Sequence, residues 1–195
     1  MTKRAYRGTT QAEVAALSRR RIIDAALELY TTSWMDEVTL QQIAERAGVT
    51  VQTVLRHFGS KAGLEDAIST VKVAETMSER DEVATGDVEG IVEYLIRHYE
   101  SIGDNSIRLL SQETRYPSLH KFMETARVLH RQWVGRVFAP YLPTEQARER
   151  FVPQLTAACD VYVWKLFRRD MGMTVDQYRD RLLDMITALI KFSGG

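Results

Sequence analysis

The chain has 195 residues, of which 45% are hydrophobic and 27% are charged. This is the composition of a globular protein, and it argues against a wholly disordered or membrane-embedded chain. The single cysteine, Cys159, excludes an intramolecular disulfide and a cysteine-based zinc site, and we expect no metal or cofactor. Because the N-terminus has no apolar segment of the signal-peptide or membrane-spanning kind, we expect a cytoplasmic protein that does not enter a membrane.

The charges are unevenly distributed, although the formal net charge is zero. Residues 1–21 contain six basic residues against one acidic residue, Glu13, whereas the later segments are balanced or acidic. Phosphate binding draws heavily on Lys and Arg side chains. The asymmetry therefore indicates a basic N-terminal end that faces DNA and a remainder that does not.

Apolar residues recur at helical spacing along nearly the whole chain, and no alternating pattern bounded by hairpin turns is visible. We therefore predict an all-α fold of about nine helices. The pattern predicts helices over about 18–30, 40–48, 51–58, 61–82, 88–102, 105–114, 118–138, 144–169 and 175–192, of which the last begins with a Thr174 and Gln177 capping box. Residues 1–17 are expected to form a flexible basic arm, residues 18–65 a three-helix DNA-binding domain, and residues 66–195 a helical bundle.

The segment 38–64 meets the physical requirements of a helix-turn-helix. Thr39 and Gln42 form a capping-box pattern, Ala44 allows two short helices to cross closely, and Gly48 can adopt the left-handed conformation that ends the first helix. In the second helix an outward Gln can pair with adenine and an outward Arg with guanine. The residues expected to contact DNA are Arg19, Arg20, Arg21, Thr39, Thr50, Val51, Gln52, Thr53, Leu55, Arg56, His57 and Lys61.

The order of these features resembles the signature of the tetracycline-repressor (TetR) family over about residues 20–68. It consists of a helix, an Ala-Gly-Val-Thr turn, a recognition helix, His57-Phe58, Ser60-Lys61 and Leu64. Lys61 matches the family's usual phosphate-binding lysine, whereas Leu55 stands where the family usually has a phosphate-contacting tyrosine. The resemblance implies a DNA-binding transcriptional regulator that acts as a dimer, with a C-terminal helical domain that senses small molecules.

The second half of the chain carries candidates for a ligand pocket, although aromatic and Met residues at helical spacing are also typical of an ordinary core. These candidates are Tyr94, His98, Tyr99, His120, Met123, Arg127, Trp133 and Trp164. Because they include many aromatic side chains and few clustered charges, we expect a small apolar or aromatic effector.

The last two helices carry apolar stripes that are too wide for one buried face, which predicts a homodimer interface. Its residues would include Tyr162, Tyr178, Leu182, Met185 and Leu189. Together these patterns favour a ligand-responsive repressor that binds a palindromic operator in double-stranded DNA. The alternative is a DNA-binding regulator without a small-molecule inducer, controlled by a protein partner. An enzyme is not favoured, because no metalloprotease, phosphate-loop or serine-hydrolase motif is present and Cys159 lies in an apolar segment.

Overall fold

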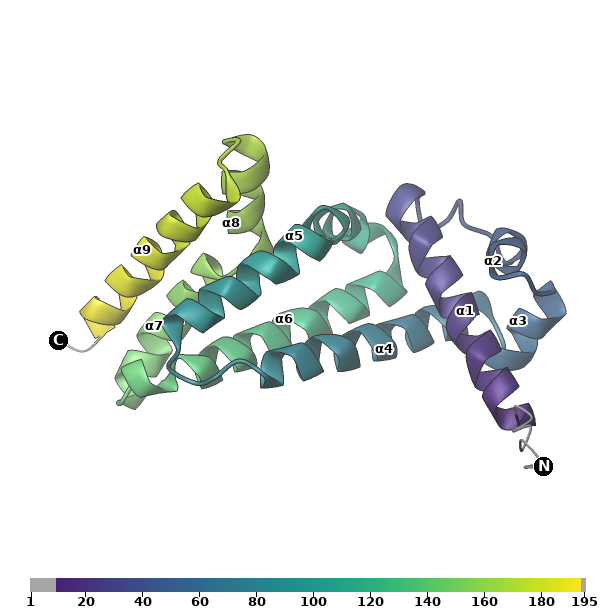
Figure 1. Ribbon diagram of the computed structural model, residues 1–195, viewed down its shortest axis with the longest axis horizontal. Helices are drawn as coiled ribbons and strands as arrows, with labels where there is room; N and C mark the ends of the chain where they lie inside the picture. The colour runs from purple at the N-terminus through teal and green to yellow at the C-terminus, as the bar shows by residue number, and fades with distance from the viewer. Residues whose placement is uncertain (1–9, 194–195) are drawn as a thin grey trace, which may run out of the picture. The chain divides into compact units, whose positions relative to one another are not determined.

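The computed structural model describes residues 10–193, which form only helices and their connections (Figure 1). The predicted all-α fold is therefore confirmed. The chain divides into two compact units, residues 1–72 and residues 73–195. None of the described helices combines the length and apolar character that crossing a membrane requires.

The first unit contains α1 (Gln11–Thr32), α2 (Leu40–Ala47), α3 (Val51–Phe58) and the beginning of α4 (Lys61–Asp81). Helix α1 packs against α2 and α3, and the two short helices pack against each other (Figure 1). Apolar side chains from all of these helices meet in one core, in which Ile22, Ile43, Val54 and Leu64 are fully buried. This small core fixes the orientation of α3 relative to α1.

Helix α1 begins at Gln11, so the expected start near Ser18 is wrong. Thr10 and Glu13 form a capping box at this end, in which the Glu13 amide donates to the Thr10 hydroxyl and the Thr10 amide donates to the Glu13 carboxylate. Such reciprocal bonds satisfy amides that a helix N-terminus otherwise leaves unpaired. Residues 11–17 are therefore helical, and of the expected arm only residues 1–9 lie outside the described residues.

The second unit contains the end of α4 and all of the later helices. These are α5 (Val88–Gln112), the short η1 (Glu113–Arg115), α6 (Pro117–Val137), η2 (Ala139–Tyr141), α7 (Glu145–Ala158), α8 (Val161–Lys165), the π-helical turn η3 (Leu166–Asp170) and α9 (Val175–Ser193). Helix α5 contacts α6, α8 and α9, while α7 contacts α6 and α9. The largest fully buried side chains of this unit include Trp133, Trp164 and Tyr94.

Two predicted boundaries in this unit are wrong. The expected break between residues 102 and 105 does not occur, because α5 runs without interruption through Gly103, which is buried against the Trp164 indole. The single helix expected over 144–169 is instead interrupted between α7 and α8. At this interruption Asp160 has an extended backbone, and its carboxylate accepts a bond from the Tyr162 amide, which starts a new helix in a new direction.

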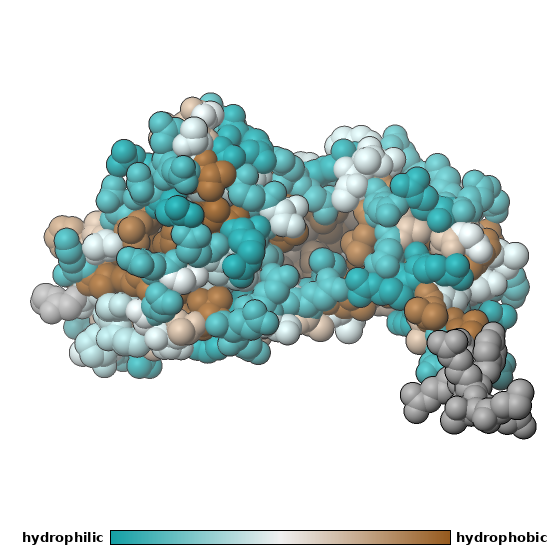
Figure 2. All heavy atoms as spheres, in the orientation of Figure 1, coloured by the Kyte–Doolittle hydropathy of each residue, from teal (hydrophilic) through white to brown (hydrophobic). Residues whose placement is uncertain are grey.

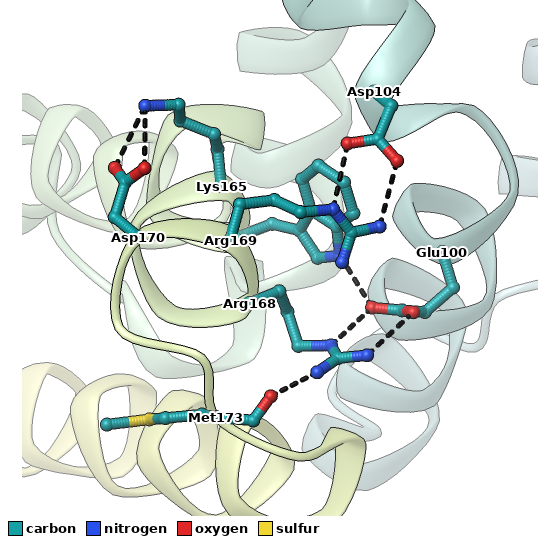
Figure 3. Close-up of polar contacts among 8 residues, drawn as sticks. Glu100, Asp104, Lys165, Arg168, Arg169, Asp170 and Met173 are labelled. Atoms are coloured by element: carbon teal, nitrogen blue, oxygen red, sulfur yellow. Dashed lines mark hydrogen bonds and ion pairs between the residues drawn. The ribbon is translucent and has the colours of Figure 1, made fainter.

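Ion pairs attach the π-helical turn to α5 (Figure 3). The Glu100 carboxylate accepts bonds from Arg168 Nε at 2.7 Å and from Trp164 Nε1 at 2.8 Å, and Asp104 accepts two bonds from the Arg169 guanidinium. Arg168 also donates to the Met173 carbonyl just before α9. The Arg168 guanidinium is the main reason that the pKa of Glu100 lies below its ordinary value. The network therefore fixes the chain between α8 and α9 against α5.

Candidate nucleic-acid interface

The turn between α2 and α3 has the geometry that the sequence predicts. The Thr39 hydroxyl accepts a bond from the Gln42 amide at 3.2 Å, and the Gln42 side chain accepts one from the Thr39 amide at 2.7 Å. At the other end of α2, Gly48 has a φ of 66°, a left-handed conformation that an L side chain would strain. The Val49 amide then donates to the Ala44 carbonyl at 2.9 Å. These contacts define where α3 starts.

Helix α3 separates an inward face from an outward face. Val54 is fully buried in the core, whereas Gln52 and Arg56 are exposed one helical turn apart on the same side. Neither Gln52 nor Arg56 forms a hydrogen bond or an ion pair with another described residue. Both side chains are therefore available to a partner.

The threonines at the start of α3 cap the helix. The Thr50 hydroxyl accepts a bond from the Thr53 amide at 3.2 Å, and the two hydroxyls lie 3.0 Å apart. Thr50 is exposed, while Val51, Thr53 and Leu55 are half-buried or exposed along the same short helix. The threonine side chains expected to contact DNA therefore also hold the helix N-terminus in shape, as the Thr39 hydroxyl does for α2.

The arginine cluster of α1 has three different environments. The Arg19 guanidinium lies 4.5 Å from the centre of the Phe58 ring and donates to the His57 carbonyl at 3.2 Å, so it joins α1 to the end of α3. Arg20 forms an ion pair with Asp24 at 2.9 Å. Arg21 is exposed, and no other described residue pairs with it.

His57 is half-buried beside this junction. Its pKa lies below the ordinary value because burial disfavours the imidazolium form and because Arg56 and Arg19 are positively charged neighbours. A neutral imidazole adds no positive charge to the surface at neutral pH. His57 is therefore suited to hydrogen bonding rather than to ionic attraction of a phosphate.

Lys61 already has a partner within the first unit. Its ammonium donates to the Met35 carbonyl at 2.5 Å and the side chain is half-buried, so it ties the connection between α1 and α2 to the start of α4. Any phosphate would have to share the ammonium with this carbonyl. The sequence pattern revealed neither this bond nor the need for Gly63, where a Cβ atom would overlap the Phe58 carbonyl oxygen.

The expected pocket residues fall into separate groups, of which one contains Tyr94, His98 and Trp133. The Tyr94 ring centre lies 5.3 Å from that of His98 and 5.3 Å from that of Trp133. His98 also pairs with Glu79 at 3.2 Å. These three side chains, from α5 and α6, are brought together in the structure, and Arg80, which sequence reasoning missed, joins them.

The other expected pocket residues bond elsewhere. Tyr99 is buried and its hydroxyl donates to the Cys159 carbonyl at 3.0 Å, while the Trp164 indole donates to Glu100. Both rings are therefore part of the core. His120 and Arg127 instead bind Glu113, and Met123 is buried on the same helix. The eight residues do not converge on one cavity.

The expected dimer residues also differ in exposure. Tyr178 and Leu182 are 1% and 0% exposed in the single chain, so they pack in its own core and a second subunit would not reach them. Met185 and Leu189 are less completely buried, whereas Tyr162 is 57% exposed. The placement of Tyr178 and Leu182 in an interface is thus corrected, because the first of the two apolar stripes on α9 faces α5 and α7.

Sequence comparison identifies the helix-turn-helix region. Residues 22–68 match the family described as bacterial regulatory proteins, tetR family. Two regulators of Pseudomonas putida, the HTH-type transcriptional regulators SrpR and TtgW, are each 46% identical over 51 residues, which is 26% of this chain. The match spans 24% of the length of SrpR and 38% of that of TtgW.

Structural comparison extends the similarity over both units. A transcriptional regulator from Rhodococcus sp. Rha1 has a TM-score of 0.71 at 17% identity, covering 91% of this chain and 98% of the other. A tetR-family transcriptional regulator from Streptomyces coelicolor has a TM-score of 0.63 at 16% identity, covering 90% of this chain and 81% of the other. At these identities the similarity establishes the fold.

Proposed function

We propose that this chain, whose residues 22–68 place it in the TetR family of bacterial regulatory proteins, is a transcriptional repressor that reads DNA with α3. The observation that carries the proposal is the pair of exposed, unpartnered side chains Gln52 and Arg56 on one face of α3. A glutamine and an arginine at this spacing can bond the edges of adenine and guanine in the major groove. The exposed Arg21 supplies a charge for phosphate.

The repressor would act as a dimer on a palindromic operator, because one short helix reads too few base pairs for useful specificity. Two copies of α3 would occupy successive major grooves about 34 to 36 Å apart. A small effector bound in the second unit would favour a different separation of the two helices and so release the DNA. This form of regulation remains preferred to control by a protein partner, because the second unit buries a group of polar side chains that suits a small molecule.

The dimer surface would lie on α8, on the π-helical turn and on the outward side of α9. Tyr162, Leu166 and Met171 are 57%, 48% and 56% exposed, and Phe192 is 76% exposed. Hydrophobic patches interrupt the hydrophilic surface of the second unit in the region of α9 (Figure 2). Large apolar side chains grouped in this way favour contact with another protein surface.

Selection of bound fragments from the source genome by the full-length protein, followed by footprinting, tests the function. We expect protection of a short inverted repeat whose half-sites are about one helical turn apart. The double variant Gln52→Ala, Arg56→Ala should fold normally and lose the preference for that site over scrambled DNA. Uniform binding to all fragments by the wild-type protein, with no enriched sequence, would contradict the proposal.

A further inference from the structure

A group of polar side chains is buried inside the second unit, at the end of α4 and on the facing parts of α5 and α6. It comprises Arg80, Tyr94, His130 and Trp133, which are 6%, 2%, 7% and 2% exposed. Arg80 Nη2 lies 3.1 Å from His130 Nδ1, and the guanidinium carbon lies 5.2 Å from the centre of the Trp133 ring. We call these four residues the Arg80 cluster.

The positive charge of Arg80 has no carboxylate partner among the described residues. Its acidic neighbours on α4 pair with other side chains, because Glu79 contacts His98 and Asp81 contacts Arg136 at 3.1 Å. Buried arginines are ordinarily paired, since a buried uncompensated charge is costly. Arg80 therefore lacks the counter-charge that such a position normally requires.

His130 does not change this charge balance. Burial and the adjacent Arg80 charge lower the pKa of His130 to about 4, so the imidazole is neutral at physiological pH. The other groups that influence it are His98, also basic, and the Thr156 backbone, which is not charged. The cluster thus carries one positive charge at neutral pH.

The unpaired atoms of the cluster include three hydrogen-bond donors. Arg80 Nε, the Tyr94 hydroxyl and Trp133 Nε1 are buried and have no hydrogen-bond partner of normal geometry among the described residues. Burial raises the pKa of Tyr94, so its hydroxyl keeps its proton and can donate. Buried polar atoms without partners are rare in proteins, and several in one place call for an explanation. Three donors and one positive charge match an anion that accepts hydrogen bonds.

We propose that the Arg80 cluster binds a small aromatic carboxylate. Its carboxylate would pair with the Arg80 guanidinium and accept bonds from Tyr94 and Trp133, while its ring would lie against these two aromatic side chains. The proposal rests on the proposed function, for which it names the chemical class of the effector. It also narrows the expected apolar or aromatic effector to one that carries a negative charge.

The position of Arg80 offers a covalent route from the effector to the DNA-binding unit. Arg80 stands near the end of α4, and the same helix begins at Lys61, directly after the turn that ends α3. An anion that draws on Arg80 therefore acts on the helix that follows the recognition helix. No other residue of the cluster belongs to α4.

Isothermal titration calorimetry and thermal unfolding of the full-length protein test this proposal with benzoate, benzamide, acetate and inorganic phosphate as probes. We expect saturable binding and a raised Tm with benzoate, and at least tenfold weaker binding of the other three. Benzamide removes the charge, acetate removes the ring, and phosphate keeps only an anion. Equal binding of benzamide or of phosphate would overturn the assignment to aromatic carboxylates, as would no binding of benzoate at millimolar concentration.

Variants distinguish a ligand-binding arginine from a structural one. Arg80→Met keeps the length of the side chain, and we expect at least a tenfold loss of benzoate affinity with an unliganded Tm equal to or above that of the wild type, because an uncompensated charge is removed. Tyr94→Phe should weaken binding severalfold. Arg131→Met, an exposed arginine on α6, is the matched control and should leave binding unchanged. A lower unliganded Tm together with unchanged benzoate affinity in Arg80→Met would show that the arginine is structural.

DNA binding by the same preparations separates the two proposals. If benzoate binds in an Arg80-dependent manner while the protein selects no DNA sequence, the carboxylate site stands and the repressor function fails. If DNA is selected but benzoate does not bind, only the carboxylate site fails.

Discussion

Gly103 of α5 lies directly against the indole of Trp164 in α8. A Cβ atom on this glycine would be 2.7 Å from Cε3 of the ring and nearer still to two other ring atoms. Trp164 is fully buried and its Nε1 is bonded to Glu100, so the ring has no free direction in which to move. The absent side chain is therefore what allows α5 and α8 to approach each other closely.

We expect Gly103→Ala to destabilise the protein by about 1 to 3 kcal/mol, because overpacking outweighs the gain in helix propensity. Urea unfolding followed by circular dichroism measures the change in the free energy of unfolding. Gly135→Ala is the matched control, since a Cβ there would meet only Val152 Cγ2 at an ordinary 3.9 Å. This control should be neutral or stabilising by up to about 1 kcal/mol, and equal destabilisation by both variants would contradict the explanation.

The ion pairs of α5 predict a loss of stability in acid. The pKa of Glu100 is lowered by Arg168 and that of Asp104 by Arg169, so both carboxylates bind protons less readily in the folded chain than in the unfolded chain. Their contribution is fully present above the unfolded pKa values and is lost as the pH falls through the lower, folded ones. The free energy of unfolding should therefore decrease as the pH falls below about 4.5, the ordinary value for Glu100.

Glu100→Gln tests the source of this dependence. The variant should be less stable than the wild type at pH 7, and the difference should shrink as the pH falls, because the wild-type carboxylate is then protonated as well. Denaturant unfolding from neutral pH down to the acid range measures this difference. Glu89→Gln, an exposed substitution on the same helix, should show no such convergence. A gap for Glu100→Gln that stays constant over the series would exclude Glu100 as a source.

The exposed face of α3 predicts which substitutions alter sequence preference. Gln52→Ala and Arg56→Ala should each cost about 1 to 3 kcal/mol on the preferred site and little on random DNA, because base contacts specify and phosphate contacts do not. Equilibrium binding to specific and scrambled duplexes gives both values. Gln41→Ala, an exposed side chain of α2 that bonds Glu45, is a control that should leave the preference intact.

Arg21 should contribute affinity rather than preference. Arg21→Ala should weaken binding to specific and scrambled DNA equally and reduce the slope of log K against log salt by about one unit for each phosphate that the arginine no longer neutralises. Arg19→Ala should behave differently, because its guanidinium holds the Phe58 ring and the His57 carbonyl, and its removal should also lower the stability of the first unit. Binding isotherms in a salt series, with thermal unfolding, separate the two effects. Identical behaviour of the two variants would be inconsistent with these roles.

Local signals in the sequence predicted the DNA-binding unit well, whereas the second unit depended on contacts that sequence does not reveal. The Thr39 capping box and the left-handed Gly48 act within a few residues, so their geometry could be inferred directly. The uninterrupted α5 depends on Trp164, which is far beyond Gly103 in the chain, and no local pattern indicates that contact. For the same reason the burial of Leu182 and the environment of Arg80 required the folded chain.

The proposed dimer surface leads to the last prediction. Tyr162→Glu together with Leu166→Glu places two charges on exposed parts of α8 and the π-helical turn without entering the core of the single chain. If a second copy covers these side chains, the charges would be buried without partners on association, so the variant should sediment as a folded monomer. Sedimentation velocity and circular dichroism measure mass and folding together. Leu17→Glu, which alters an exposed apolar residue of α1, should leave the mass unchanged. Because a monomer presents only one α3, the Tyr162, Leu166 variant should also bind a full operator no more tightly than a half-site, and a folded variant that keeps the dimer mass would place the interface elsewhere.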